Sequence, residues 1–515
     1  MQDYSSNNKR LAKNTVFMTL RMLILMVISL YTSRVTLDVL GVDDFGIYNI
    51  VGGVVVLFSF ISTSLNNACN RYFSLALVDN NPDSFQKSFS TALFAHLLLT
   101  FAILIILETA GLWFITNKVN IPTERVEISK VVFQFAVFSV CINTLRVPFN
   151  ASILCHEKMD FYASVGLIEG VLKLLIAFCI IRIPLDKLMS YSILMACSVF
   201  LIFLAVATLC VKKFEGDRIV LKTDKKSLKE MLSFSGWNLI GGIADVGWQQ
   251  GVNIILNLFF GVVYNAVFGI INQIRNAVFA FVDSLQSAAN PQIIKSSANE
   301  NNSHMQSLVF SVSKLSFYSM LLISLPLISG MDFVLNLWLV DVPQGCASFT
   351  IGMLMFCVAS SLCGPLWVVV QASGKIKLYY VVVSLIYLLN VPVTYILFRF
   401  GFPAISTMFV RFFLQILAVI WTFLCAKRLA GLCSKHYFTE VLIPVFGVSL
   451  ITAVLLFLIV FIIDIESVRF FIALFLGDSL LALSIYFWGI NKHEREICVG
   501  FIQSLKKKWR LLKRE

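Results

Sequence analysis

The sequence predicts an all-α polytopic membrane protein with about fourteen transmembrane helices, arranged as two related six-helix bundles followed by one further helix pair. The composition is 58% hydrophobic and only 14% charged, which is more apolar surface than a soluble core of this length can bury. Apolar stretches of about 20 residues, enough to cross roughly 30 Å of hydrocarbon, also recur along the chain. We expect spans at 14–38, 45–77, 86–115, 131–154, 160–182, 186–211, 231–258, 264–293, 305–330, 346–373, 376–399, 404–426, 438–463 and 468–490.

Segments of the first half recur in the second half. Leu40-Gly41-Val42 matches Phe260-Gly261-Val262, and the run that begins at Pro148 matches the run that begins at Pro365, in the same order. Such matches indicate two related halves, which in membrane proteins are typical of transporters that rock around a central site. We therefore predict an N-terminal bundle, a basic linker, a C-terminal bundle, an additional helix pair and a basic tail at residues 1–213, 214–230, 231–430, 431–491 and 492–515.

Lysine and arginine gather before the first span, in the linker and at the end of the chain. The basic residues concerned are Lys9, Arg10, Lys13, Lys212, Lys213, Arg218, Lys222, Lys225, Lys226, Lys229, Lys506, Lys507, Lys508, Arg510, Lys513 and Arg514. The positive-inside rule places these segments, and both termini, in the cytoplasm. We attribute the net charge of +12 to this topology and expect no nucleic-acid partner. One loop is an exception to the rule, because it carries Lys118, Arg125 and Lys130 where few basic residues are expected.

No motif points to catalysis. The twelve cysteines and five histidines have no metal-type or redox spacing, and there is no phosphate-binding glycine loop and no nucleophile elbow. We expect no enzyme, no cofactor and no metal site.

Polar residues fall where lipid would reject them, along one face of spans one, two, seven and eight. Such faces must meet water or protein, so we expect these four spans to line a central aqueous cavity. The seventh span also holds five glycines, which favour a hinge. The expected polar lining is Asn67, Asn70, Asn238, Gln249, Asn253, Asn272, Asn276 and Asn290.

Arg21 and Arg275 are the leading candidates for anion binding, because each lies deep in a span on a polar stripe. An intramembrane arginine costs at least about 2.5 kcal/mol and therefore indicates a function by default. A structural ion pair with Asp245 or Asp283 is the alternative. These two carboxylates are also candidates for ion coupling, although an aspartate beside Arg275 would more simply stay ionised.

Arg71 and Arg146 complete the set of expected pyrophosphate-binding residues. Arg146 adjoins Pro148, where a kink frees carbonyl groups, so its substrate and structural roles stay equally open. Arg71 lies near the cytoplasmic surface, where snorkelling is the alternative. Glu169 and Lys173 are four residues apart in the fifth span, and we interpret them as an intrahelical ion pair.

Two longer motifs resemble a known family. The run L-G-V-x-x-F-G-I-Y from Leu40 to Tyr48 and the run P-F-N-A-x-I-x-x-H-E-K-M-x-F-Y-A from Pro148 to Ala163 resemble Wzx-type polysaccharide or O-antigen flippases. These belong to the multidrug/oligosaccharidyl-lipid/polysaccharide exporter superfamily. The resemblance covers about residues 10 to 430 and extends to the appended pair, because members with fourteen spans are common.

The resemblance implies a MATE-like fold with a V-shaped cavity, in the bacterial inner membrane. It also implies alternating access that moves an undecaprenyl pyrophosphate-linked oligosaccharide from the cytoplasmic to the periplasmic leaflet. Membrane lipids, H+ or Na+ and glycan polymerases are the expected partners. The alternatives are a multidrug antiporter, a flippase for the peptidoglycan precursor (lipid II) and a non-transporting scaffold for a polymerase complex.

Overall fold

The structure is a computed structural model of the chain. It describes residues 2–58, 66, 69, 72, 73, 76, 82–156, 158–214, 246–298, 302–373, 376–491 and 494–496.

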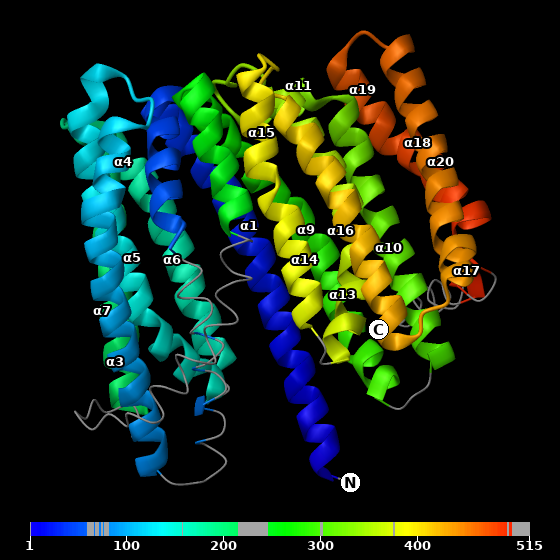
Figure 1. Ribbon diagram of the computed structural model, residues 1–515, viewed down its shortest axis with the longest axis horizontal. Helices are drawn as coiled ribbons and strands as arrows, with labels where there is room; N and C mark the ends of the chain where they lie inside the picture. Colours follow the sequence, from blue (N-terminus) through cyan, green and yellow to red (C-terminus); the bar gives the residue numbers. More distant parts are fainter. Residues whose placement is uncertain are drawn as a thin grey trace, which may run out of the picture. The chain divides into compact units, whose positions relative to one another are not determined.

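Throughout the described ranges the regular elements are helices (Figure 1). The helices of the first half are α1 (Gln2–Val56), α3 (Pro82–Ile106), α4 (Leu112–Asn117), α5 (Val126–Cys155), α6 (Met159–Cys179) and α7 (Lys187–Lys213). Those of the second half are residues 246–260, α9 (Val262–Ala298), α10 (Asn302–Ser329), α11 (Met331–Trp338), α12 (Cys346–Ser360), α13 (Cys363–Ala372), α14 (Lys377–Leu388), α15 (Asn390–Arg399) and α16 (Ser406–Ala430). The last helices are α17 (Ser434–Tyr437), α18 (Ile443–Ile462), α19 (Glu466–Ile472) and α20 (Asp478–Ser484).

Many of the expected spans coincide with observed helices, but the helix at Ile24–Val56 runs from the first expected span into the second, and α9, at the eighth, is not among the helices that qualify as spans. Ten helices of the described residues are long and apolar enough to cross a membrane, or 11 if α12 and α13, which meet at 41°, form one span. The expected span 160–182 corresponds to a helix at Asp160–Arg182, and 376–399 to one at Lys377–Arg399. Much of the spans expected at 45–77 and 231–258 lies outside the described residues. The all-helical, multi-pass membrane class is confirmed.

Both copies of the repeated Gly-Val motif have the same backbone conformation. Gly41 has φ 77° and kinks α1, and Gly261 has φ 82° and separates the helix at 246–260 from α9. Side chains strongly disfavour this left-handed region, so glycine is the residue that turns the chain here. Each copy of the motif therefore ends one helix and starts the next.

The described residues form two compact units. The first contains residues 1–273, 338–346 and 387–407, and the second contains 274–337, 347–386 and 408–515.

In the first unit α5 packs against α3, α7 and α1, while α1 packs along α6 (Figure 1). Gly170 of α6 permits this last contact, because a Cβ atom there would lie 2.7 Å from Leu25 Cδ2 of α1. Apolar residues fill the space around α3, α5 and α7, with Phe89 and Phe149 meeting edge to face at 5.3 Å. The result places the polar residues of α1 opposite α6.

Arg125, one of the basic residues that depart from the positive-inside pattern, has two carboxylate partners. Its guanidinium contacts Asp44 of α1 at 3.0 Å and also Asp186, which caps the first turn of α7. On the next helix, Lys130 pairs with Glu127 at 2.6 Å. Two of the three basic residues of this loop thus have carboxylate partners within the protein.

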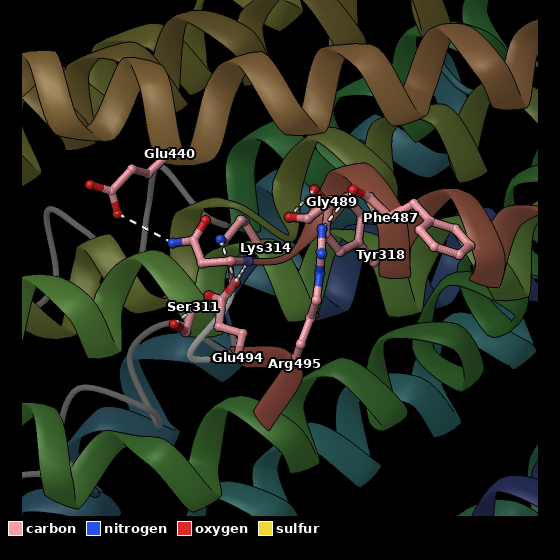
Figure 2. Close-up of polar contacts among 9 residues, drawn as sticks. Ser311, Lys314, Tyr318, Glu440, Phe487, Gly489, Glu494 and Arg495 are labelled. Carbon is pink, nitrogen blue, oxygen red and sulfur yellow. Dashed lines mark hydrogen bonds and ion pairs between the residues drawn. The ribbon is translucent and has the colours of Figure 1, made fainter. Parts of the chain in front are cut away.

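In the second unit α10 is the helix on which the additional pair docks, since it packs against α18, α19 and α20. Glu494, just beyond the last span, is held by α10 (Figure 2). Its carboxylate accepts hydrogen bonds from Ser311 Oγ at 2.5 Å, Lys314 Nζ at 2.7 Å and the Asn491 backbone N–H at 2.7 Å. The Lys314 side chain is only 1% exposed. We call Ser311, Lys314, Asn491 and Glu494 the Glu494 cluster.

Candidate functional site

A polar cavity of about 360 Å³ lies within the first unit. It is lined by α1 on both sides of the Gly41 kink, by α6, and by single residues of α7 and α9. Its lining residues are Leu25, Ile28, Ser29, Thr32, Ser33, Thr36, Phe45, Tyr48, Asn49, Gly166, Glu169, Gly170, Lys173, Tyr191 and Gln273. Residues of the expected spans one, two and eight line this cavity, and spans five and six supply further lining, whereas none of the described residues of span seven does.

The α1 wall presents hydroxyl groups. Thr32 Oγ1 donates to the Ile28 carbonyl at 2.7 Å, and Ser33 Oγ contacts the Ser29 carbonyl at 2.8 Å as well as the Gln273 side chain. Hydroxyls inside helices commonly donate to the carbonyl four residues earlier. Because the Thr32 proton is used in this way, its oxygen lone pairs remain to accept hydrogen bonds.

The charged group of the cavity joins α5 and α6. Glu169 accepts from Lys173 Nζ at 3.0 Å with one carboxylate oxygen, and from Arg146 Nη1 at 3.2 Å with the other. The side chains of Arg146, Glu169 and Lys173 are 16%, 22% and 40% exposed. We call these three residues the Glu169 cluster. With two cations and one anion its formal charge is +1, and Glu169 is the one carboxylate in the described lining.

Close backbone approach positions Asn49 at the cavity. Asn49 Nδ2 donates to the Phe45 carbonyl at 2.8 Å, and a Cβ atom at Gly269 of α9 would lie 2.6 Å from Asn49 Oδ1. Glycine at 269 is therefore required for α9 to reach this wall. Beside Asn49, Tyr48 and Tyr191 meet edge to face, with 4.9 Å between their ring centroids.

Asn253, an expected lining residue, lies in a buried amide network. Its side chain accepts from Asn265 Nδ2 at 2.7 Å, and Asn257 Nδ2 donates to Asn265 Oδ1 at 2.8 Å. Asn257 also accepts from the Asn120 backbone N–H at 2.7 Å. Because Asn253 is only 2% exposed and these amides have protein partners, the network joins helices and does not line the cavity. Asn253 and Asn257 belong to the polar face that the sequence predicts for this span, and this described part of the face meets protein.

The other expected residues of the first unit that the structure describes, apart from Arg146, are Asn272 and Gln249, and neither lines the cavity. Asn272 donates to the Phe268 carbonyl at 2.8 Å, and its neighbour Gln273 reaches the cavity instead. Gln249 is half-buried in the helix at 246–260. Arg146, expected to bind substrate or to stabilise the kink at Pro148, contacts Glu169 at 3.2 Å, and its expected role stays a prediction.

Arg275 belongs to the second unit. Its guanidinium lies 5.4 Å from the Phe279 ring and donates to Asn276 Oδ1 at 3.4 Å. Asp283 is exposed, and no ion pair within 4.0 Å joins it to Arg275 in the part of the chain that the structure describes. Asp245 lies outside that part, so the structural ion pair stays a prediction. Asn276 is exposed and Asn290 is half-buried.

Six expected residues lie outside what the structure describes and stay predictions. Those concerned are Asn67, Asn70, Arg71, Asn238, Asp245 and the side chain of Arg21.

Sequence reasoning missed the functional setting of Glu169 and Lys173. Their ion pair is confirmed, but the two residues also line the cavity. A glutamate within a transmembrane span by itself indicates a functional site. Sequence reasoning also missed Gln273 and, in the second unit, Arg411 of α16, which is 0% exposed and lies 5.3 Å from the Phe356 ring. Nothing in the described residues gathers three His, Cys, Asp or Glu side chains as a metal site.

The chain matches no protein-family model and no curated protein. Among solved structures it is similar to an inward-facing multidrug resistance MATE family transporter of the MOP superfamily, with a TM-score of 0.67 and 14% identity. That match covers 80% of this chain and 98% of the other. A mutant of the Vibrio cholerae MATE transporter VcmN matches with a TM-score of 0.56 and 16% identity, over 85% of this chain and 100% of the other. The helices and the cavity of this protein are thus built on the fold of MATE family transporters.

Proposed function

We propose that this protein is a flippase that moves a lipid-linked oligosaccharide, carried on undecaprenyl pyrophosphate, for surface polysaccharide synthesis. The observation that carries the proposal is the chemistry of the cavity in the first unit. Its described lining has one carboxylate, Glu169, and that carboxylate is held by two cations. A net positive site inside a membrane protein favours an anionic ligand.

The uncharged lining suits the sugar. Sugar hydroxyls donate and accept hydrogen bonds, and the wall formed by α1 presents hydroxyl oxygens that accept them, with the amides of Asn49 and Gln273 beside it. A volume of about 360 Å³ is at the lower end of ligand-sized pockets. The polar part of such a substrate would enter while the long lipid chain stays in the bilayer.

Alternating access in the inner membrane, towards the periplasmic leaflet, is the transport cycle that we propose. Arg21, Arg71 and Arg275 are proposed as further contacts of the pyrophosphate during this cycle. Asp245 and Asp283 are proposed as groups that couple it to H+ or Na+. Glycan polymerases are the proposed protein partners.

A multidrug or cation antiporter is the second candidate, and the fold favours it because the matched MATE structure is named as a multidrug resistance transporter. An organic cation needs an unpaired carboxylate or an aromatic cage. Glu169 is paired, which weighs against this function.

The test is transport by purified protein in liposomes. We expect the wild type to move a fluorescent lipid-pyrophosphate saccharide between leaflets and to leave ethidium untransported. The Arg146→Gln variant should lose flipping, whereas Lys130→Gln, which removes a cation from the same helix away from the cavity, should keep it. Transport of ethidium without lipid flipping would replace the proposal with the multidrug function.

A further inference from the structure

We propose that Arg146 and Lys173 form a binding site for a phosphate or pyrophosphate group, and that Glu169 occupies this site as an internal substitute when no ligand is bound. This inference rests on the proposed function for the identity of the ligand. Its geometry is independent of that function.

The first argument is the way in which the three side chains meet. Each oxygen of the Glu169 carboxylate takes one cation, Arg146 at 3.2 Å and Lys173 at 3.0 Å. Phosphate oxygens accept the same charge-assisted hydrogen bonds from guanidinium and ammonium groups as carboxylate oxygens do. A phosphate that replaces the carboxylate therefore finds both donors already in place.

The second argument is the charge balance. Two cations and one carboxylate leave one positive charge unneutralised, and none of the other described lining residues carries a charge. A pyrophosphate diester carries two negative charges, so it neutralises this pair of cations more completely than one glutamate does. Coulomb attraction between such close charges is strong where the surroundings are poorly solvated.

The third argument is access. Glu169 and Lys173 line the cavity, while Arg146 contacts Glu169 from the neighbouring helix α5. The side chains are 16% to 40% exposed, so the cluster is not sealed by protein. A ligand in the cavity can thus reach the carboxylate and replace it.

The fourth argument is the reason for a substitute. An uncompensated charge inside a protein is strongly destabilising. Without Glu169 the empty site would hold Arg146 and Lys173 next to each other with no anion between them. An internal carboxylate keeps the empty site stable and is itself released when a stronger anion arrives.

The test measures binding of inorganic pyrophosphate, and in parallel of a polyprenyl pyrophosphate, to the full-length protein in detergent by titration calorimetry. Removing the competing carboxylate in Glu169→Gln should tighten pyrophosphate binding about tenfold or more, since one charged contact is worth at least that factor. Arg146→Gln should weaken binding by a similar factor. Lys130→Gln, whose cation pairs with Glu127 on the same helix, should bind as the wild type does.

Two further outcomes separate this inference from the proposed function. If Glu169→Gln binds no more tightly than the wild type, the cluster is a structural clamp and the inference is wrong, whatever the flipping assay gives. If inorganic pyrophosphate binds as expected but polyprenyl pyrophosphate does not, the anion site stands and the flippase is wrong. The double variant Arg146→Gln/Glu169→Gln, which removes one charge of each sign, keeps the test valid if a single variant misfolds, and it should also bind weakly.

Discussion

Two glutamates of this protein are paired with basic side chains, Glu494 with one and Glu169 with two, and their surroundings differ. Glu494 and its partner Lys314 are 12% and 1% exposed, and the Glu494 carboxylate accepts hydrogen bonds from two side chains and one backbone N–H (Figure 2). Glu169 accepts from two side chains, is 22% exposed and faces a cavity. A saturated, buried charge fastens one helix to another, whereas a paired charge that an outside molecule can reach is suited to binding.

The largest expected effect follows from removing the charge of Glu494. Glu494→Gln leaves the Lys314 ammonium buried without an anion, and breaking a buried ion pair costs about 3–5 kcal/mol. We expect a large loss in the free energy of unfolding, measured by denaturation in detergent, and early proteolysis in the additional helix pair. The double variant Lys314→Met/Glu494→Gln should recover much of this loss, because no unpaired charge remains. A loss below about 1 kcal/mol in the single variant would mean that the cluster does not fasten the pair.

A smaller loss is expected from Arg146→Gln. Glu169 then keeps Lys173 as a partner, and the side chains are partly exposed, so the penalty of a fully buried pair is reduced to about 1–3 kcal/mol. Denaturation of Arg146→Gln and Glu494→Gln under the same conditions shows which variant loses more free energy of unfolding. An equal or larger loss for Arg146→Gln would contradict the distinction between the two clusters.

Glu169→Gln distinguishes the two clusters most clearly, because its effect on the free energy of unfolding should depend on a bound ligand. We expect a loss of about 1–2 kcal/mol in buffer, since two cations are left without a carboxylate. Added inorganic pyrophosphate should restore the stability by binding to the folded state. In Glu494→Gln the same anion should restore less, because the Lys314 side chain is only 1% exposed. Equal rescue of both variants would show a general salt effect.

The smallest effect is expected for Lys130→Gln. The pair of Lys130 with Glu127 is exposed, and such surface pairs contribute about 0–1 kcal/mol. Denaturation should therefore give a value within about 1 kcal/mol of the wild type. A larger loss would make this variant unsuitable as a control and would reveal a structural role of the loop that precedes α5.

The fold could be predicted because its signals are local. Length and hydropathy gave the spans, and the repeated motif indicated two related halves, in which Gly41 and Gly261 then proved to share a left-handed backbone conformation. The Glu169–Lys173 pair was also visible, because residues four apart meet on one helix face.

The site could be predicted only in part, because its chemistry depends on which helices pack together. A polar helical face does not reveal its neighbour, so Asn253 was expected in a cavity although other asparagines of the protein surround it. Arg146 and Glu169 lie 23 residues apart on different helices, which no periodicity relates. The contribution of Gln273 likewise depends on the approach of α9 to α1 at Gly269.

The most direct test of the account compares flipping by Arg146→Gln and Glu494→Gln in liposomes, with each rate divided by the amount of folded protein. The substrate is a fluorescent lipid-pyrophosphate saccharide, and the temperature is one at which both variants are folded. The account predicts that Arg146→Gln has lost flipping although it is the more stable of the two, and that Glu494→Gln flips at the wild-type rate per folded molecule. Wild-type flipping by Arg146→Gln would contradict the assignment of the cavity as the substrate site.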